Sequence, residues 1–257
     1  MALPVRLAVV HGLAQEISAA ARDARPLAVG GVLAEVLQKE LARGGDPTAV
    51  LVGGPEGAAL YLHVLGTEAV PDEEAFKQAR RARVPFVAIT HGEERLPYVL
   101  ATDVVRIRPG AGFPVEEIVR VVARKLGERG TALAARLPLL RGPLCDRLIG
   151  TFSLRNGIVG AAVFIPGVDL PVLALNQLRL VLRIAAAHGQ EVDAQRLPEV
   201  MGTIGAGFGL RNVARELLDF VPVAGWAVKG AVAYAGTRAL GEAALLWFAE
   251  RNRARPG

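Results

Sequence analysis

Short apolar runs alternate with helical patterns between residues 26 and 128, and this alternation ends near Gly130. Strands that alternate with helices are typical of a parallel sheet whose faces are covered by helices. The runs that predict strands lie at 26–29, 48–54, 59–65, 84–90 and 103–107, and the helical patterns lie at 32–43, 71–82 and 114–128. The first part of the chain is therefore expected to form an α/β domain.

The rest of the chain follows a different pattern. After Gly130 there is no convincing β-alternation, and glycines and prolines separate helical patterns at 131–140, 143–152, 156–164, 171–188, 194–204, 208–219 and 222–250. We therefore predict a fold of the α/β plus all-α class, with a Rossmann-like or P-loop-GTPase-like, mostly parallel sheet followed by a helical domain. The predicted domains are residues 1–130 and 131–257.

Composition narrows the choice of partners and compartment. The 257 residues have a formal net charge of +5, but only 5% are aromatic residues that could stack on bases, and the basic cluster at 77–83 follows acids on the same predicted helix. Nucleic acid is therefore not expected as a partner, whereas an anionic membrane surface stays open. No signal peptide or simple transmembrane span is predicted. We expect a cytoplasmic protein, or one held peripherally at the cytosolic face of a membrane.

Motifs for catalysis and metal binding are not found in the sequence. His11, His63, His91 and His188 are far apart and show no HExxH-type pairing, and no GxSxG string occurs. Cys145 is the only cysteine, which excludes a disulfide framework and a cysteine-based zinc site. We therefore predict no catalytic residues, no metal and no cofactor. A chain that is not an enzyme is favoured, and an enzyme that uses a cleft at the strand ends stays the alternative.

The first candidate site follows two of the predicted strands. In doubly wound sheets, ligands bind just beyond the carboxyl ends of the strands. Thr90 and His91 come directly after the strand at 84–90, and Gly53 and Gly54 come at the end of the run at 48–54. Backbone amides in such glycine turns can hold an anion. We expect these four residues to line a ligand cleft, with a plain turn as the alternative for the two glycines.

The order of elements from 59 to 128 resembles the second half of a small GTPase domain of the translation-factor-related kind. "LYLHVLGTEAVPDEEAFKQARRARVPFVAITHGEE" takes the place of a strand, an acidic helix start and a strand of the NKxD type. "LATDVVRIRPGAGFPVEEIVRVVARKLGE" is similar to the closing segment of that family, and "VLVGGPEG" lies where such proteins have a strand and a DTPG turn.

Departures from the GTPase pattern concern the nucleotide. No GxxxxGK[ST] string exists, and Lys39, Lys77 and Lys125, the lysines of the first half, do not follow a glycine loop. "THGE" replaces the guanine-reading NKxD. The sequence therefore favours a degenerate, catalytically inactive GTPase-like domain over an ordinary Rossmann-like binding domain, and both over an active NTPase.

Two stretches of the second half, "IPGVDLPVLALNQLRLVLRIAAAHGQEVD" and "FVPVAGWAVKGAVAYAGTRALGEAALLWFAE", resemble the GTPase-associated helical domain of unknown function of YcjF-like bacterial proteins. The resemblance implies a module found beside GTPases or in membrane-associated proteins. The predicted function is a non-catalytic GTPase-like adaptor or scaffold that docks on a membrane, a GTPase or another protein partner. The alternatives are a small-molecule-binding or nucleotide-binding α/β protein, and a membrane-inserting or membrane-remodelling helical protein; a homo-oligomer stays open.

Polar residues in the helical half form the second candidate site. The predicted cluster comprises Asp169, Asn176, Arg179, Arg183, Arg215 and Glu242. Because a buried arginine needs a partner, at least one of Arg179 and Arg183 is expected to contact a carboxylate. A structural ion-pair network between helices is the favoured interpretation, and a polar cleft for an anionic headgroup or a partner's carboxylate is the alternative.

Overall fold

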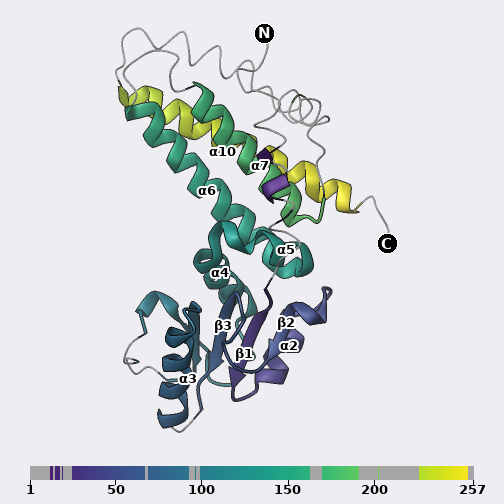
Figure 1. Ribbon diagram of the computed structural model, residues 1–257, viewed down its shortest axis with the longest axis vertical. Coiled ribbons are helices and arrows are strands. Elements are labelled where there is room, and N and C mark those ends of the chain that lie inside the picture. The colour runs from purple at the N-terminus through teal and green to yellow at the C-terminus, as the bar shows by residue number, and fades with distance from the viewer. Residues whose placement is uncertain are drawn as a thin grey trace. The chain divides into compact units, whose positions relative to one another are not determined.

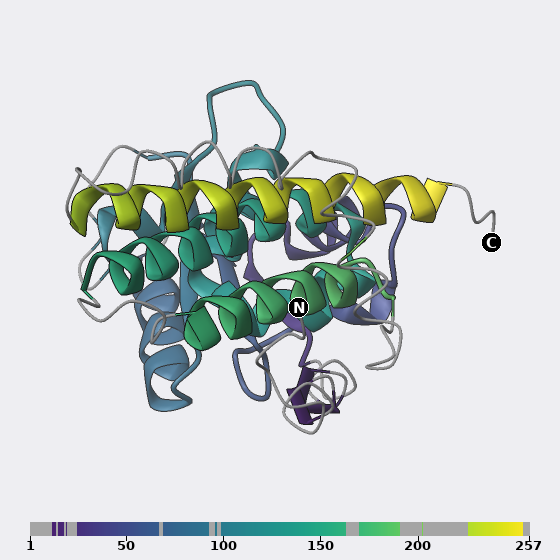
Figure 2. The same ribbon diagram turned by 90° about the horizontal axis from the view of Figure 1, so that it is seen from above.

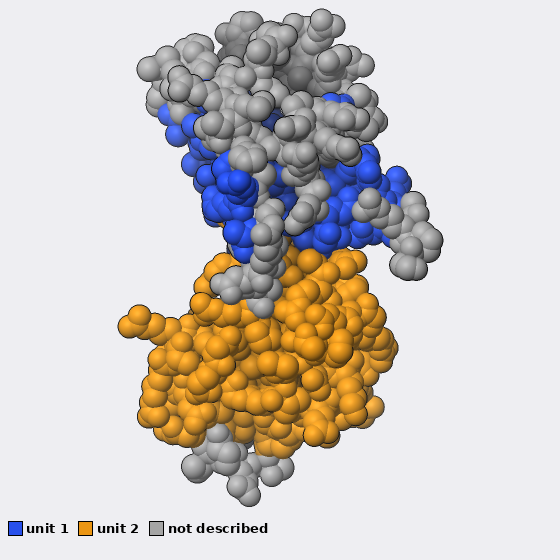
Figure 3. Space-filling view, turned by 45° about the vertical axis from the view of Figure 1, so that its right-hand side comes forward, with its two compact units in different colours: residues 1–21, 145–257 blue, residues 22–144 orange. Residues whose placement is uncertain are grey.

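The structure is a computed structural model of the chain, and it describes residues 12–13, 15–17, 19, 25–66, 69–92, 96, 99–162, 170–190, 202 and 226–253. The chain divides into two compact units, coloured separately in Figure 3. The α/β unit spans Arg22–Leu144, and the helical unit combines Met1–Ala21 with Cys145–Gly257. The domain boundary expected at residue 130 stays a prediction.

The elements follow one another in an α/β order and then an all-helical order (Figure 1). The strands are β1 (Leu27–Gly31), β2 (Val50–Val52), β3 (Leu60–Val64), β4 (Phe86–Thr90) and β5 (Val104–Arg106). The helices are α2 (Ala34–Leu41), α3 (Ala69–Arg81), α4 (Val115–Leu126), α5 (Thr131–Arg136), α6 (Pro138–Ala162), α7 (Leu170–Ala187) and α10 (Trp226–Arg253). Short 3₁₀ turns lie at Pro47–Ala49, Ala101–Asp103 and Gly127–Gly130.

The five strands form one sheet in the order β2-β1-β3-β4-β5, and every neighbouring pair is parallel. The predicted α/β arrangement with a parallel sheet is therefore confirmed. All five residues of the central strand β3 are buried, as expected of a strand covered on both faces. Helix α4 packs through an apolar stripe that includes Ile118, Val122 and Leu126, while Glu116 and Glu117 begin the helix and Arg124 and Lys125 end it, as the helix dipole favours.

The connection from β2 to β3 is short and contains no helix. It runs from Gly53 to Ala59 and crosses β1, because β1 lies between β2 and β3 in the sheet. Gly57 has a φ of 75°, a left-handed conformation that favours glycine, and the amide of Ala59 donates to the carbonyl of Pro26 at the start of β1. The glycines of "VGGPEG" therefore build a tight crossover between parallel strands.

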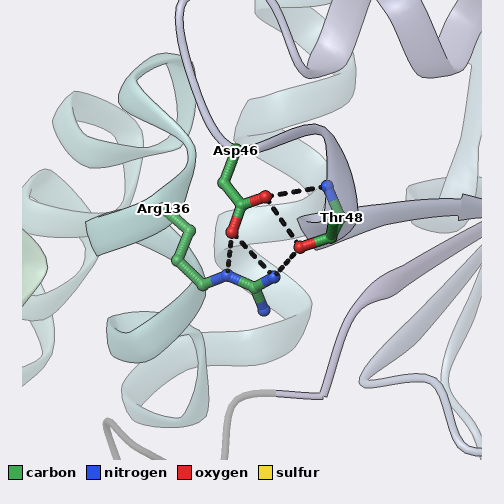
Figure 4. A network of polar contacts seen from close by, with 3 residues as sticks. All are labelled: Asp46, Thr48 and Arg136. Atoms are coloured by element: carbon green, nitrogen blue, oxygen red, sulfur yellow. Dashed lines mark hydrogen bonds and ion pairs between the residues drawn. The ribbon is translucent and has the colours of Figure 1, made fainter.

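A polar network joins α5 to the turn before β2 (Figure 4). Asp46 accepts hydrogen bonds from the amide and hydroxyl of Thr48 at 2.8 and 2.7 Å, and from the guanidinium of Arg136 at 3.0 Å. The amide of Asp46 donates in turn to the carbonyl of Arg136 at 2.9 Å. Hydrogen bonds from the hydroxyl and amide of Thr48, followed by those from Arg136, hold the pKa of the Asp46 carboxyl below its ordinary value.

Helices α6, α7 and α10 lie alongside one another in the helical unit (Figure 2). Glycines allow α6 and α10 to approach closely: a Cβ on Gly160 would lie 2.9 Å from the Cβ of Ala233, and a Cβ on Gly230 would lie 2.8 Å from the carbonyl oxygen of Gly157. The sequence analysis placed helix breaks near Pro143 and Gly157, and this was wrong, because α6 is continuous through both positions. Pro143 lies near the beginning of α6, and the glycines provide interhelical contact.

Candidate functional site

The carboxyl edge of the sheet beside β1 and β3 is where this topology would place a ligand. After β1 the chain moves to one side of the sheet, and after β2 it moves to the other. In doubly wound folds, the crevice at such a switch point is the usual binding site. The residues that shape it here are those that follow β1, β3 and β4.

The turn from β1 to α2 contains only Val32 and Leu33. The amide of Val32 donates to the carbonyl of Val64 at 3.0 Å, and a Cβ on Gly31 would overlap that same carbonyl oxygen. Gly31 has a φ of 84°, which explains why glycine occupies this close approach. The ends of β1 and β3 are therefore hydrogen-bonded to each other, and the turn between β1 and α2 is too short to surround a phosphate.

The neighbouring amides also donate to acceptors of the protein itself. The amide of Leu65 donates to the carbonyl of Ile89 at 2.8 Å, and that of Gly66 donates to the Oδ2 of Asp72 at 3.2 Å. After β4, the amide of Gly92 donates to the hydroxyl of Thr90 at 3.0 Å. These are the groups that would hold an anion in a phosphate cradle.

The predicted cleft residues lie on strands that are not adjacent. Gly53 and Gly54 follow β2, whereas Thr90 ends β4 and His91 follows it, and β1 and β3 lie between β2 and β4. Neighbouring strands are about 4.8 Å apart, so the two pairs start roughly 14 Å from each other. The Thr90 side chain is engaged by Gly92, and His91 is exposed. The ligand cleft itself stays a prediction.

A buried chain of hydrogen bonds underlies this edge of the sheet, from Tyr61 through His63 to Asp72. The hydroxyl of Tyr61 lies 2.8 Å from the Nδ1 of His63, and the Nε2 of His63 lies 2.7 Å from the Oδ1 of Asp72. A neutral imidazole with its proton on Nε2 satisfies all three groups: Tyr61 donates to Nδ1, and Nε2–H donates to the carboxylate. The second oxygen of Asp72 accepts from Gly66, which ties α3 to the end of β3.

Burial keeps this chain away from any substrate. Tyr61 is 3% exposed and His63 is 5% exposed. Burial, and then the charges of Asp72 and Glu56, raise the pKa of Tyr61 to about 12, so the hydroxyl is a hydrogen-bond donor at neutral pH. The Tyr61 ring also fills the space over Gly30, where a Cβ would overlap the hydroxyl. A Tyr-His-Asp chain can act as a proton relay, but at these exposures it joins β3 to α3 instead.

Sequence reasoning missed this chain of residues. Two signals were present: Tyr61 and His63 are two apart on a strand and so share a face, and Asp72 lies in the first turn of the next helix. The sequence analysis treated His63 as isolated and assigned the acids of helix 71–82 to the helix dipole.

A second buried polar network connects α6, α7 and α10. The amide nitrogen of Asn156 donates to the hydroxyl of Thr237 at 2.8 Å and to the carbonyl of Leu173 at 3.4 Å, and Asn176 donates to the Oδ1 of Asn156 at 2.8 Å. Thr237 also accepts from Gln177 at 3.3 Å and donates to the carbonyl of Ala233 at 2.8 Å. Every polar atom of the Asn156 side chain is thus satisfied inside an apolar bundle.

The other members of the predicted polar cluster are distributed differently. Glu242 is exposed and pairs with Arg238 on the same helix, at 2.8 Å. Arg179 and Arg183 lie on α7, each half-buried. Asp169 and Arg215 are outside the described residues, so the ion pair expected for the α7 arginines stays a prediction. Asn176 joins Asn156 and Thr237 instead of the arginines.

Two further findings concern the described part of the chain as a whole. Within it, no helix combines the length and apolar character needed to cross a membrane. Nor does that part contain a group of three or more His, Cys, Asp or Glu side chains placed to hold a metal ion.

Comparisons of the chain with protein-family models, with curated proteins and with solved structures give no match.

Proposed function

We propose that this protein is a non-catalytic adaptor or scaffold whose α/β unit has a GTPase-like or Rossmann-like topology without a working nucleotide site. The strand order 2-1-3-4-5, all parallel, is one of the common doubly wound orders and supports the Rossmann-like description. The sequence resemblances to a GTPase domain and to a GTPase-associated helical module support the adaptor function. Protein partners, GTPases among them, are the proposed ligands.

One observation supports this proposal more than any other: the backbone amides at the switch point already donate hydrogen bonds to acceptors of the protein itself. The amides of Val32, Gly66 and Gly92 all donate to internal acceptors. A phosphate entering there would have to displace these acceptors, and each buried group left unpaired costs about 1–3 kcal/mol. A two-residue turn after β1 also leaves no room for the loop that P-loop proteins use.

The lysines support the same conclusion. Lys77 pairs with Glu73 and Glu74 on α3, and Lys125 pairs with Asp103 beside β5. Neither is placed to neutralise a phosphate at the switch point, where an active NTPase would need its lysine.

Isothermal titration calorimetry of the full chain with GTP and ATP, with and without Mg²⁺, tests the proposal. We expect no saturable binding with a Kd below about 1 mM, and no phosphate release above the uncatalysed rate. Micromolar binding of either nucleotide would overturn the non-catalytic assignment in favour of the nucleotide-binding alternative.

A second candidate function, docking on an anionic membrane surface, is favoured by the outer face of α6. Leu154 and Ile158, one turn apart, are 58% and 60% exposed, and the exposed Arg147 and Arg155 lie on the same helix. Apolar side chains flanked by arginines suit an anionic lipid surface. If this surface is used, the Leu154→Ser, Ile158→Ser double variant should lose co-sedimentation with phosphatidylserine vesicles, while Leu246→Ser, a control 55% exposed on α10, should retain it.

A further inference from the structure

Five of the large apolar side chains exposed on the α/β unit lie in the turn after β1, on α2 and on β2, whereas Leu100 and Leu139 lie elsewhere on this unit. Val32 and Leu33 lie in the turn after β1, Val36 lies in the first turn of α2, and their exposures are 45%, 57% and 48%. Leu51 and Val52 on the adjoining strand β2 are 47% and 46% exposed. Leu51 and Val52 are consecutive on a strand and so face opposite sides of the sheet, whereas Val32, Leu33 and Val36 follow one another from the turn into α2. Exposed apolar side chains that lie together mark an interaction site more often than scattered ones do.

The backbone of the turn between β1 and α2 is strained at Leu33, which is also its most exposed residue. Leu33 has a φ of 56°, in the left-handed region that a leucine rarely adopts, and it has the highest exposure of the five apolar residues. Such a conformation is unfavourable for a residue with a side chain and persists where the surrounding structure holds it. The turn therefore presents the leucine side chain outward.

A partner at this surface would contact exposed side chains and would not add a strand to the edge of the sheet at β2. Although β2 is an edge strand, it has only three residues, and the carbonyl of Val50 already accepts a hydrogen bond from Gln38 of α2 at 2.8 Å. A short, partly capped edge is a poor template for an added strand. Helix α2 lies beside β1 and β2 (Figure 1), and its residues Glu35, Val36 and Lys39 are exposed.

The charges on α2 indicate what that partner is. Glu35 and Lys39 are exposed on either side of Val36, have opposite signs, and have no ion-pair partner among the described residues. The next pair along the chain, Glu40 and Arg43, is by contrast already bridged at 3.0 Å. When two copies of a helix pack antiparallel around a twofold axis at the level of residue 37, residue 35 of one copy approaches residue 39 of the other, and Val36 lies within one turn of its symmetry mate. The α2 face, comprising Val32, Leu33, Glu35, Val36 and Lys39, is therefore complementary to itself.

We propose that the α2 face is the interface of a homodimer, in which Val36 packs against its symmetry mate and Glu35 pairs with Lys39 of the second copy. This inference goes beyond the adaptor function and does not depend on it, because the nucleotide titration and the oligomeric state are separate measurements.

Sedimentation velocity of the full chain between about 1 and 100 µM tests the dimer. We expect a concentration-dependent dimer that Val36→Asp weakens at least about tenfold. The matched control is Leu100→Asp, a residue 70% exposed elsewhere on the same unit, which should dimerise like the parent chain. Unchanged thermal melting of both variants as monomers would show that they fold. A monomeric parent chain throughout this range, or a dimer that Val36→Asp leaves intact, would overturn the proposal.

A charge exchange tests the antiparallel geometry. Glu35→Lys and Lys39→Glu should each weaken self-association, because like charges then meet across the twofold axis. An equimolar mixture of the two single variants should dimerise, since opposite charges face each other again in the mixed pair, and the Glu35→Lys, Lys39→Glu double variant should recover its own dimer. A mixture that stays monomeric would contradict the assigned pairing.

Discussion

At the scale of single residues, the hydroxyl of Tyr61 is the group whose removal most directly tests the buried chain. Tyr61→Phe keeps the ring over Gly30 but leaves the Nδ1 of His63 without its donor. An unsatisfied buried acceptor costs about 1–3 kcal/mol, so urea unfolding should show a loss of that size. Tyr234→Phe, on the half-buried Tyr234 of α10, is the matched control and should change stability by less than about 1 kcal/mol. Equal effects of the two variants would contradict a structural role for the chain.

The same hydroxyl predicts how stability changes in alkali. The pKa of Tyr61 is raised from 10.0 to about 12, chiefly by burial, so the folded state keeps a proton that the unfolded state loses first. This contribution is complete below about pH 10 and is lost between about pH 10 and 12. Tyrosinate absorbance at 295 nm should show one of the three tyrosines titrating last, and Tyr61→Phe should remove that step. Three tyrosines titrating together near pH 10 would contradict the prediction.

Asp46 predicts how the stability of the protein changes in acid. Its pKa is lowered below 3.8, first by the Thr48 hydroxyl and amide and then by Arg136. The carboxylate therefore contributes stability above the unfolded pKa, and this is lost as the pH falls through the folded pKa. Asp46→Asn should be less stable than the parent chain near neutral pH, and the two curves should converge in acid. Asp146→Asn, at an exposed carboxylate of α6, is the control; a gap that persists at pH 2 would contradict the assignment.

Single residues were also where the sequence was least informative. The spacing of Tyr61 and His63 places them on one face of a strand, but it does not show whether His63 reaches a helix of the same fold. The pairing depends on where α3 packs against β3, which is a tertiary property. Thr90 and His91, in contrast, were correctly placed at a strand end because the apolar run before them ends there.

At the scale of elements, Asn156 sets the register of three helices. Its side chain reaches α10 through Thr237 and α7 through Asn176 and Leu173. Asn156→Ala should lower stability by about 2–4 kcal/mol, because it leaves a cavity and removes these bonds together. Gln177→Ala is the matched control, since it loses only a 3.3 Å contact to the same hydroxyl from a half-exposed position, and it should cost less than about 1 kcal/mol. An Asn156→Ala variant as stable as Gln177→Ala would argue against a register role.

Strands and amphipathic helices could be predicted from the sequence, whereas the positions at which helices end could not. The apolar run at 59–65 becomes β3 and the stripe at 114–128 becomes α4, because each pattern has the period of its element. The helix breaks that the sequence predicts near Pro143 and Gly157 are wrong, because both residues lie within α6, where Gly157 and Gly160 face α10. Whether a glycine ends a helix or provides a contact depends on the neighbouring helix, which a local pattern does not contain.

At the scale of the whole molecule, the sequence predicted the succession of an α/β part and a helical part, because the change from alternating runs to helix-only patterns is a property of composition over many residues. The hydrogen bonds at the carboxyl edge of the sheet were not predictable. They depend on the pairing of β1 with β3, which brings the Val64 carbonyl to the Val32 amide, and on the crossover from Gly53 to Ala59, which places the glycine turn beside β1.

We propose that the backbone amides at this edge of the sheet are satisfied by acceptors of the protein itself and bind no nucleotide. The most direct test of this proposal is a titration of the ¹⁵N-labelled full chain with GTP and Mg²⁺, following the amide resonances of Val32, Gly66 and Gly92 by heteronuclear NMR. We predict that these resonances show no saturable shift up to about 1 mM nucleotide and remain protected from hydrogen exchange with solvent. Saturable shifts of the three amides at micromolar GTP, with the Val32 amide exchanging freely before nucleotide is added, would contradict the account.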